Sequence, residues 1–267
     1  MSAENKTALI TGATSGIGYE LAKIFAENGY DLFLVARSEN ELQQTAEEFK
    51  QQFNVSVETI PADLFNRESA FEIYDQLQSR NIQINVLVND AGQGQYGEFI
   101  ETDINREMDI IQLNIISLVA LTKQFLKDMV ARGEGRILNV ASIAGKLPGP
   151  LQAVYHGTKA FVHSFTEAIR EEVKDKGVVI TSLLPGATDT DFFNKADMLD
   201  SKIVQEGKLS DPAKVARDGY DALMNDDDMV VSGMKNKMQV AMSNVTPDAM
   251  VSKMMHKQQE PVNKEEE

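Results

Sequence analysis

Residues 7–18 read TALITGATSGIG, a short apolar run that passes through a glycine-rich turn into an amphipathic segment. Glycines at positions 12, 16 and 18 let the backbone turn tightly and let the first N–H groups of a helix point at a bound pyrophosphate. No Gly-Lys-Ser/Thr follows, which excludes a nucleoside-triphosphate P-loop. The stretch therefore predicts the opening strand, turn and helix of a dinucleotide-binding sheet, with a strand–helix turn that binds no ligand as the alternative.

Short apolar runs alternate with longer amphipathic segments along almost the whole chain. The short runs are continuously apolar, as is typical of strands covered on both faces. We therefore predict the α/β class: a single doubly wound parallel sheet of the Rossmann type, with about seven strands and helices on both faces. Strands are expected at 7–11, 32–36, 55–60, 86–89, 136–141, 178–184 and 229–232, and helices at 16–28, 38–52, 67–80, 103–132, 152–176 and 211–225.

Length and composition fit one globular domain of 267 residues, with 42% hydrophobic and 25% charged residues. The net charge of −15 disfavours nucleic acid and anionic membranes as partners. The absence of cysteine excludes disulfides, thiolate metal sites and cysteine nucleophiles. With no signal segment and no apolar run of bilayer length recognised, we expect a cytoplasmic chain without stable membrane insertion. Residues 1–233 form the expected domain, 234–256 a helical extension of it, and 257–267 a disordered tail.

The spacing of the turn, T-G-x-x-x-G-x-G, resembles that of the short-chain dehydrogenase/reductase family, and the resemblance covers residues 7 to about 233. It implies a nicotinamide cofactor. NAD enzymes usually place an acid at the end of the second strand to bind the ribose 2′-hydroxyl. Here Ala36 and Arg37 stand at that point, whereas Asp31 lies at the wrong end of the strand. An arginine suits a 2′-phosphate, so NADP(H) is the predicted cofactor.

Further cofactor contacts are implied by the resemblance. Asp63 matches the adenine-contacting aspartate, although a helix N-cap is an equal alternative. The sequence NDAG at 89–92 resembles the family's N-N-A-G, with Asp90 as a departure. The predicted cofactor-binding residues are Gly12, Thr14, Ser15, Gly16, Ile17, Gly18, Arg37, Asp63, Leu64, Asn89, Ala91, Gly92, Tyr155, Lys159, Pro185, Gly186, Thr188 and Thr190, of which Pro185, Gly186 and Thr190 face the nicotinamide.

Tyr155 and Lys159, in YHGTK, are the predicted acid/base pair, because residues four apart share a helix face. Ionising a tyrosine at pH 7 costs about 4 kcal/mol. A lysine ammonium about 4 Å away supplies an interaction of that order. Tyr19 and Lys23 have the same spacing, but no other catalytic element accompanies them, so we interpret them as an incidental surface match.

Ser142 ends the fifth predicted strand and can donate a hydrogen bond to a substrate carbonyl, with a strand-end cap as the alternative. Asn114 lies among isoleucines inside a predicted helix, where asparagine is a poor choice. The resemblance implies that Asn114 completes a catalytic group with Ser142, Tyr155 and Lys159 by ordering a relay water; a satisfied core asparagine is the alternative. The three histidines fit no metal spacing and are expected to be structural, so no metal site is predicted.

These features predict an NADP(H)-dependent oxidoreductase that reversibly reduces a ketone or aldehyde, with Ser142 and Tyr155 binding the substrate. The expected rim, residues 93–96, 144–151 and 187–193, is mostly apolar or neutral and favours a small or medium hydrophobic carbonyl compound. A 3-oxoacyl thioester reductase of fatty-acid type is the main alternative, although no basic patch for an acyl carrier was found. A non-catalytic NADP(H)-sensing protein is a weaker one.

Two apolar patterns exceed what one buried face requires. In the helix expected at 152–176, a second stripe of Val154, Phe161, Phe165 and Ala168 predicts a homodimer or homotetramer. Beyond the last strand, Met234, Met238 and Met242 recur every four residues, and Met250 and Met254 follow on a second segment. Core packing is the plain interpretation of these methionines. A mobile cover or partner contact is the sharper hypothesis, and a membrane-surface helix is less favoured.

Overall fold

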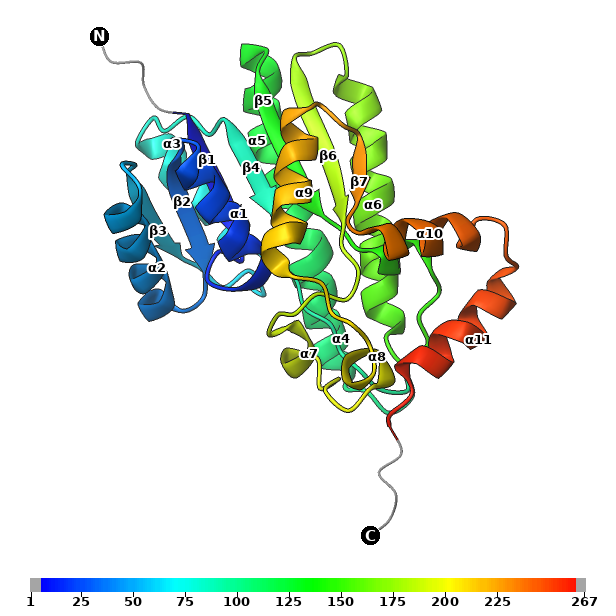
Figure 1. The fold of residues 1–267 in the computed structure, drawn as a ribbon. Coiled ribbons are helices and arrows are strands. Elements are labelled where there is room, and N and C mark those ends of the chain that lie inside the picture. The colour runs from blue at the N-terminus through cyan, green and yellow to red at the C-terminus, as the bar shows by residue number, and fades with distance from the viewer. Residues whose placement is uncertain (1–5, 263–267) are drawn as a thin grey trace.

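The structure is a computed structural model that describes residues 6–262. It contains one parallel seven-stranded sheet in the order β3-β2-β1-β4-β5-β6-β7 (Figure 1). Chain order reverses between β1 and β4, which places a ligand crevice at the carboxyl ends of these two strands. The predicted fold class is confirmed. The strands are β1 Thr7–Thr11, β2 Asp31–Ala36, β3 Val57–Pro61, β4 Val86–Asn89, β5 Gly135–Val140, β6 Val178–Leu184 and β7 Met229–Val231.

Helices cover both faces of the sheet (Figure 1). One face packs against α1 Gly16–Glu27, α2 Glu39–Gln52 and α9 Pro212–Met224, and its core includes Ile10, Phe25 and Val215. The other face packs against α3 Ser69–Ser79 and α5 Leu118–Arg132, while α6 Ala153–Val173 lies beside β5 and β6. Because both faces are covered, the central strands are buried along their whole length, which explains their continuously apolar sequences.

The helix expected at 103–132 is interrupted. It consists of α4 Ile104–Ile111, a π-helical segment η1 Gln112–Ser117, and α5. Within η1 the Ser117 hydroxyl donates to the Leu113 carbonyl at 2.5 Å, and the buried Asn114 amide bonds outside the helix. π-Bulges of this kind often mark functional sites. The break follows from the hydrogen bonds that the buried side chains of Asn114 and Ser117 make, and hydrophobic periodicity does not report such bonds.

The run Ile104–Arg132 is long and apolar enough to cross a membrane by length and composition, with a mean hydropathy of 1.3. The expectation that no run reaches that length was therefore wrong. In the fold, 44% of its most apolar window is buried, and α5 packs on α3, β4, β5 and β6. A core helix of a soluble protein passes the same test, so the run is weak grounds for a membrane span.

Beyond β7 the chain forms α10 Met234–Ser243 and α11 Asp248–Gln259, which diverge as a V beside the sheet (Figure 1). The predicted disorder of 257–267 is wrong for residues 257–262; the remaining five lie outside the described residues. Lys257–Gln259 form the end of α11. The Tyr96 hydroxyl donates to the Gln259 carbonyl at 2.5 Å, Lys202 pairs with Glu260 at 3.0 Å, and the Val262 N–H donates to the Asp200 carbonyl. These long-range partners, which no local pattern reveals, hold the segment.

Candidate active site

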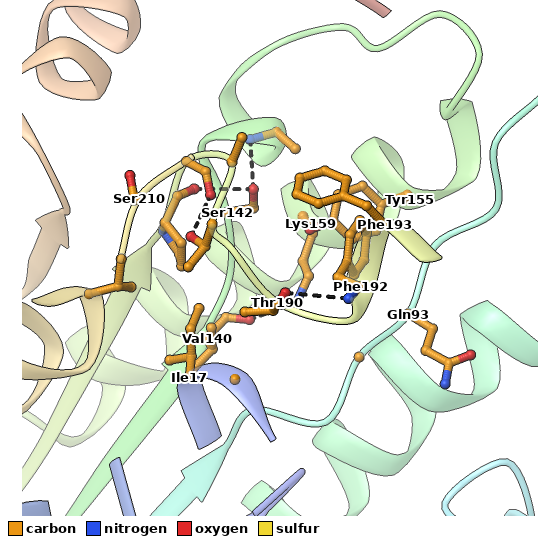
Figure 2. A pocket seen from close by; sticks show the side chains of 18 of the residues that line it. Ile17, Gln93, Val140, Ser142, Tyr155, Lys159, Thr190, Phe192, Phe193 and Ser210 are labelled. Atoms are coloured by element: carbon orange, nitrogen blue, oxygen red, sulfur yellow. Dashed lines mark hydrogen bonds between the residues drawn. The ribbon is translucent and has the colours of Figure 1, made fainter. Parts of the chain in front are cut away.

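A cavity of about 1670 Å³ opens at the carboxyl ends of the central strands, where the sheet order predicts a ligand crevice (Figure 2). Its wall includes the glycine turn, the ends of β2, β4, β5 and β6, the start of α6 and parts of α7–α11, with α7 at Phe192–Lys195 and α8 at Lys202–Gln205. Elements far apart in the sequence therefore share one pocket.

The glycine turn between β1 and α1 is shaped for a close ligand. Gly12 and Gly16 have φ of +73° and +59°, which favours glycine. A Cβ at Gly18 would lie 2.4 Å from the Gly12 carbonyl oxygen, so only glycine permits this close packing. The N-cap residue Ser15 makes no side-chain cap to α1, and Gly16 and Ile17 at the start of the helix line the cavity, where helix N–H groups can bind an anion. The turn thus fits a pyrophosphate.

Arg37 stands in the cavity wall directly after β2, as predicted. Its guanidinium lies 5.1 Å above the Phe65 ring, and within residues 6–262 it makes no ion pair. Asp63 also lines the cavity and accepts a hydrogen bond from the Phe65 N–H at 3.1 Å. Because α3 begins only at Ser69, Asp63 is not its N-cap. This end of the pocket presents a cation and an aromatic ring, which suits a phosphorylated adenosine.

The residues of NDAG have separate roles. Asn89 does not line the cavity; its amide donates to Thr122 at 3.0 Å and Asn139 at 2.9 Å in the core. Asp90 does line the cavity, and its carboxylate accepts from the Gly18 N–H of the glycine turn. Burial raises the pKa of Asp90, while Lys159 and the Gly18 N–H lower it. Asp90 therefore links the glycine turn to Lys159, the predicted catalytic lysine, a role that the sequence left open.

The predicted catalytic side chains come from three neighbouring elements. Ser142 follows β5, accepts from the Ala144 N–H at 3.0 Å, and begins the short 3-10 helix η2 Ile143–Lys146. Ser142 thus caps a helix, and it also lines the pocket, so its role toward a substrate carbonyl stays a prediction. Tyr155 and Lys159 lie one turn apart on α6 and face the same cavity. The Phe192 ring lies against Tyr155 with centres 4.9 Å apart (Figure 2).

The charge environment of Tyr155 differs from the sequence-based expectation. Lys159 Nζ lies 5.9 Å from the centre of the Tyr155 ring and donates to the Val140 carbonyl at 2.8 Å. Burial raises the pKa of Tyr155 to about 12; a hydrogen bond from Ser142 lowers it, and Asp90 raises it. Burial also lowers the pKa of Lys159, while the Asp90 carboxylate raises it. The lowering of the Tyr155 pKa by Lys159, expected from the sequence, is not among these causes, and it stays a prediction.

Asn114 sits in η1 beside this group. Its amide donates to the Gln93 carbonyl at 2.9 Å and to the Thr158 hydroxyl at 3.0 Å, and its Oδ1 accepts from the Gln93 N–H. A Cβ added to Gly92 would lie 3.3 Å from both Asn114 Oδ1 and Lys159 Nζ, so the two groups flank the same glycine. The side chain fixes the loop after β4, and the break in helical bonding around it can free backbone carbonyls for water.

The structure thus brings nearly all predicted site residues to one cavity. Gly18, Asn89 and Asn114 are the exceptions, since they support the wall without lining it. Tyr19 points elsewhere, with its hydroxyl donating to Glu48 at 2.7 Å, so its spacing from Lys23 is incidental. His163 contacts Ser182, whereas His156 bonds Leu147 through Nδ1 and Gln259 through Nε2.

Several wall residues were missed by the sequence interpretation. Met254, Met255 and Gln259 of α11 line the cavity, and Leu147, Val251 and Met255 form a small core beneath it. The Met periodicity marked this segment, but its placement over the site depends on the Gln259–His156 contact. Six lysines also line the cavity from α7 to α11: Lys195, Lys202, Lys208, Lys214, Lys235 and Lys257.

Residues 6–199 match the sequence model of the family described as short chain dehydrogenase. The chain belongs to this family. The resemblance expected from the glycine turn and YHGTK is thereby confirmed. The very-long-chain 3-oxoacyl-CoA reductase of Rattus norvegicus is 38% identical over 184 residues, which is 67% of this chain and 58% of the rat protein. This short-chain dehydrogenase thus matches less than two thirds of the length of that relative.

Two solved structures resemble this short-chain dehydrogenase closely. A short-chain dehydrogenase from Sphingobium yanoikuyae in complex with NADPH has a TM-score of 0.81 and 27% identity, covering 91% of this chain and 97% of that one. The bulky-bulky ketone specific alcohol dehydrogenase from Comamonas testosteroni has a TM-score of 0.77 and 25% identity, covering 91% and 94%. Both structures therefore share the fold of this chain over about nine tenths of its length.

The Asp90 carboxylate gives a testable pH effect. It raises the pKa values of both Tyr155 and Lys159, so removing its charge lowers both. Alcohol oxidation needs the deprotonated tyrosine, and its kcat/KM therefore rises as pH passes the pKa of that base. Asp90→Asn, which restores the family's N-N-A-G, should therefore move this rise in kcat/KM, the acidic limb of the pH profile, to lower pH.

Profiles of oxidative kcat/KM against pH check this expectation. Asp63→Asn is the matched control, because it neutralises a carboxylate at the adenosine end of the same cavity and should leave the limb in place. A limb that stays unmoved in Asp90→Asn, or moves to higher pH, contradicts the assignment.

Proposed function

We propose that this chain is an NADP(H)-dependent reductase of a hydrophobic ketone or aldehyde, working reversibly. The observation that carries the proposal is the single cavity that Arg37, the glycine turn, Ser142, Tyr155 and Lys159 line together. The glycine turn would hold the pyrophosphate, Arg37 the 2′-phosphate, and Lys159 the nicotinamide ribose. Pro185–Thr190 after β6 would cover the nicotinamide. The cradle fits this group, because its glycines carry no side chains and the start of α1, which Ser15 does not cap, lines the cavity.

Each catalytic side chain has a defined task in this proposal. A bound NADPH would supply a hydride to the carbonyl carbon. Ser142 donates a hydrogen bond to the carbonyl oxygen, and Tyr155 donates the proton that completes the alcohol. Lys159 lies one turn along α6 from Tyr155 and would hold the nicotinamide ribose beside it. We propose that Asn114 holds the loop after β4 and anchors the water that returns a proton toward Lys159.

The substrate part of the cavity is mainly apolar. Leu147, Phe192, Phe193, Met198 and Met255 surround the space beside Tyr155. Such a surface favours a hydrophobic carbonyl compound over a carboxylate or sugar. The presence of Asn114, Ser142, Tyr155 and Lys159 together is the reason to prefer an enzyme over a sensing protein, since a sensor has no need of this group.

A 3-oxoacyl thioester is the second candidate substrate, supported by two observations. The buried Gln152 Nε2 has no hydrogen-bond partner and lies near Tyr155, where a second carbonyl could accept from it. The six cavity lysines could bind a phosphorylated carrier, and the rat relative is named a 3-oxoacyl-CoA reductase. The failure to locate a basic patch from sequence arose because these lysines are scattered between residues 195 and 257.

We also propose a homodimer or homotetramer. Phe161 of the second apolar stripe on α6 is exposed, and so are Ile104 and Met108 of α4 and Ile116 of η1. Phe161 and Phe165 stack with ring centres 5.8 Å apart. Exposed apolar surface on neighbouring helices is typical of a subunit interface.

A substrate panel tests the proposed function. Hydrophobic ketones, aldehydes and 3-oxoacyl-CoA esters are each offered with NADPH and with NADH. We expect turnover with NADPH on hydrophobic carbonyl compounds, and a preference for NADPH on the order of tenfold or more. Preferential turnover of the CoA esters would select the second candidate. No turnover of any carbonyl compound, with tight NADPH binding retained, would favour the sensing protein instead.

A further inference from the structure

Five of the six methionines of α10 and α11 are exposed, whereas Met255 belongs to the core. Met234, Met238, Met242, Met250 and Met254, together with Val245 between the helices, are 56–85% exposed. The interior side of the hairpin uses other residues, namely Val240, Val251 and Met255. Core packing of the methionine stripe is therefore wrong, and each of the two helices presents an exposed row of methionines; together we call the two rows the methionine face.

Lysines border the methionine face on both helices. On α10, Lys235 and Lys237 flank the row Met234–Met238–Met242, since positions one before or after a row member lie at its edges. On α11, Lys253 and Lys257 lie beside Met250 and Met254, and all four lysines are exposed. Residues 234–257 hold four lysines against one aspartate, a net charge of +3, in a chain whose net charge is −15.

We propose that the methionine face docks on the surface of an anionic phospholipid bilayer. Apolar side chains bordered by lysines are what an interfacial helix presents to headgroups and upper acyl chains. The acidic remainder of the chain is repelled by the same surface, which would orient the molecule with the hairpin inward. This is docking in the interface plane, without a membrane span.

A second copy of the chain is the competing occupant, and charge disfavours it. A two-fold interface brings the same surface of both copies together. Four lysines on each side would then face four lysines, whereas the exposed apolar residues of α4, η1 and α6 carry no such basic border. An anionic lipid surface neutralises these lysines instead.

The methionine face adjoins the active-site cavity, so docking would bring the cavity close to the bilayer. Met234 and Met254 belong to this face and also line the active-site cavity, as do Lys235 and Lys257. The face therefore runs into the mouth of the pocket. A hydrophobic compound dissolved in the bilayer could enter the cavity without crossing water.

Vesicle sedimentation of the purified full chain tests the proposal. We expect binding to vesicles of phosphatidylcholine with one third phosphatidylglycerol, weak binding to phosphatidylcholine alone, and release at high salt. Lys237→Gln with Lys253→Gln should weaken binding roughly 25-fold, at about fivefold for each lysine near an anionic surface. Met238→Asp with Met250→Asp should weaken it on the order of tenfold or more. None of these four residues lines the cavity.

Control variants distinguish binding through α10 and α11 from general effects of the substitutions on the protein. Ile100→Asp alters another exposed apolar side chain and should keep wild-type binding. Turnover of a water-soluble ketone should stay unchanged in both hairpin pairs, which shows that they fold. Wild-type protein that stays in the supernatant with both lipids overturns the proposal, as does equal binding to neutral vesicles or undiminished binding of the Met→Asp pair. A fall in particle mass of that pair without lipid, measured by light scattering, overturns it in favour of a subunit contact.

Discussion

Tyr155→Phe should lower kcat by a factor on the order of a hundred or more, the range typical of general acid–base catalysis. The change removes the hydroxyl that donates the proton and leaves the ring, so the contact with Phe192 is retained. Because the ring stays in the wall, NADPH affinity should remain close to that of the wild type. Steady-state kinetics with a turned-over ketone, and fluorescence titration with NADPH, measure the two quantities separately.

Tyr19→Phe is the matched control within the same chain. Tyr19 also precedes a lysine by four residues on a helix, and it also loses one hydroxyl, here bonded to Glu48. It lies outside the cavity wall, so kcat should stay near the wild-type value. If Tyr155→Phe keeps substantial turnover, or if both variants lose activity alike, Tyr155 is not the proton donor.

The fold could be predicted because its signals are local and repeated. The TGATSGIG turn and the continuously apolar strands each specify part of a doubly wound sheet, and the observed strand ends differ from the expected ones by no more than two residues. The break at η1 was missed, because it follows from the hydrogen-bond needs of Asn114 and Ser117. Helical periodicity reports which face is apolar, and it says nothing about such needs.

The candidate site also contains residues that the sequence predicted correctly and residues that it did not. Gly12, Ser142, Tyr155 and Lys159 belong to short motifs whose spacing survives in one sequence, and all four line the cavity. Asn89 also belongs to a short motif, but its side chain points into the core, where it bonds Thr122 and Asn139. Neighbouring residues along a strand point to opposite sides, and here Asp90, the next residue, lines the cavity instead.

What no motif could supply is the contribution of the C-terminal segment. Gln259 lies 103 residues from His156, and their 3.1 Å contact places α11 over the pocket. The polar, charged composition of 257–267 argued for disorder, yet Gln259 is buried. A few specific long-range partners outweigh local composition there.

Arg37→Asp should lower kcat/KM with NADPH roughly ten- to hundredfold while sparing or improving kcat/KM with NADH. Loss of a charge-assisted contact to the 2′-phosphate costs about 1.5–3 kcal/mol, and an aspartate would add repulsion. The new carboxylate could instead accept a hydrogen bond from a ribose 2′-hydroxyl. Arg37 is exposed and Ser38 after it caps α2 through the Glu41 N–H, so the change should leave the fold intact.

Arg106→Asp is the control that isolates the position of the charge. The Arg106 guanidinium lies 5.4 Å from the same Phe65 ring, but Arg106 does not line the cavity. Both variants change the net charge equally, so a general electrostatic effect on an anionic cofactor would appear in both. We expect the NADPH/NADH ratio of kcat/KM to reverse or collapse only in Arg37→Asp. A wild-type preference for NADH, or an unchanged ratio in Arg37→Asp, would show that the 2′-phosphate is not recognised here. An equal fall in both variants would assign the effect to long-range charge, since both arginines lie near Phe65 and only Arg37 lines the cavity.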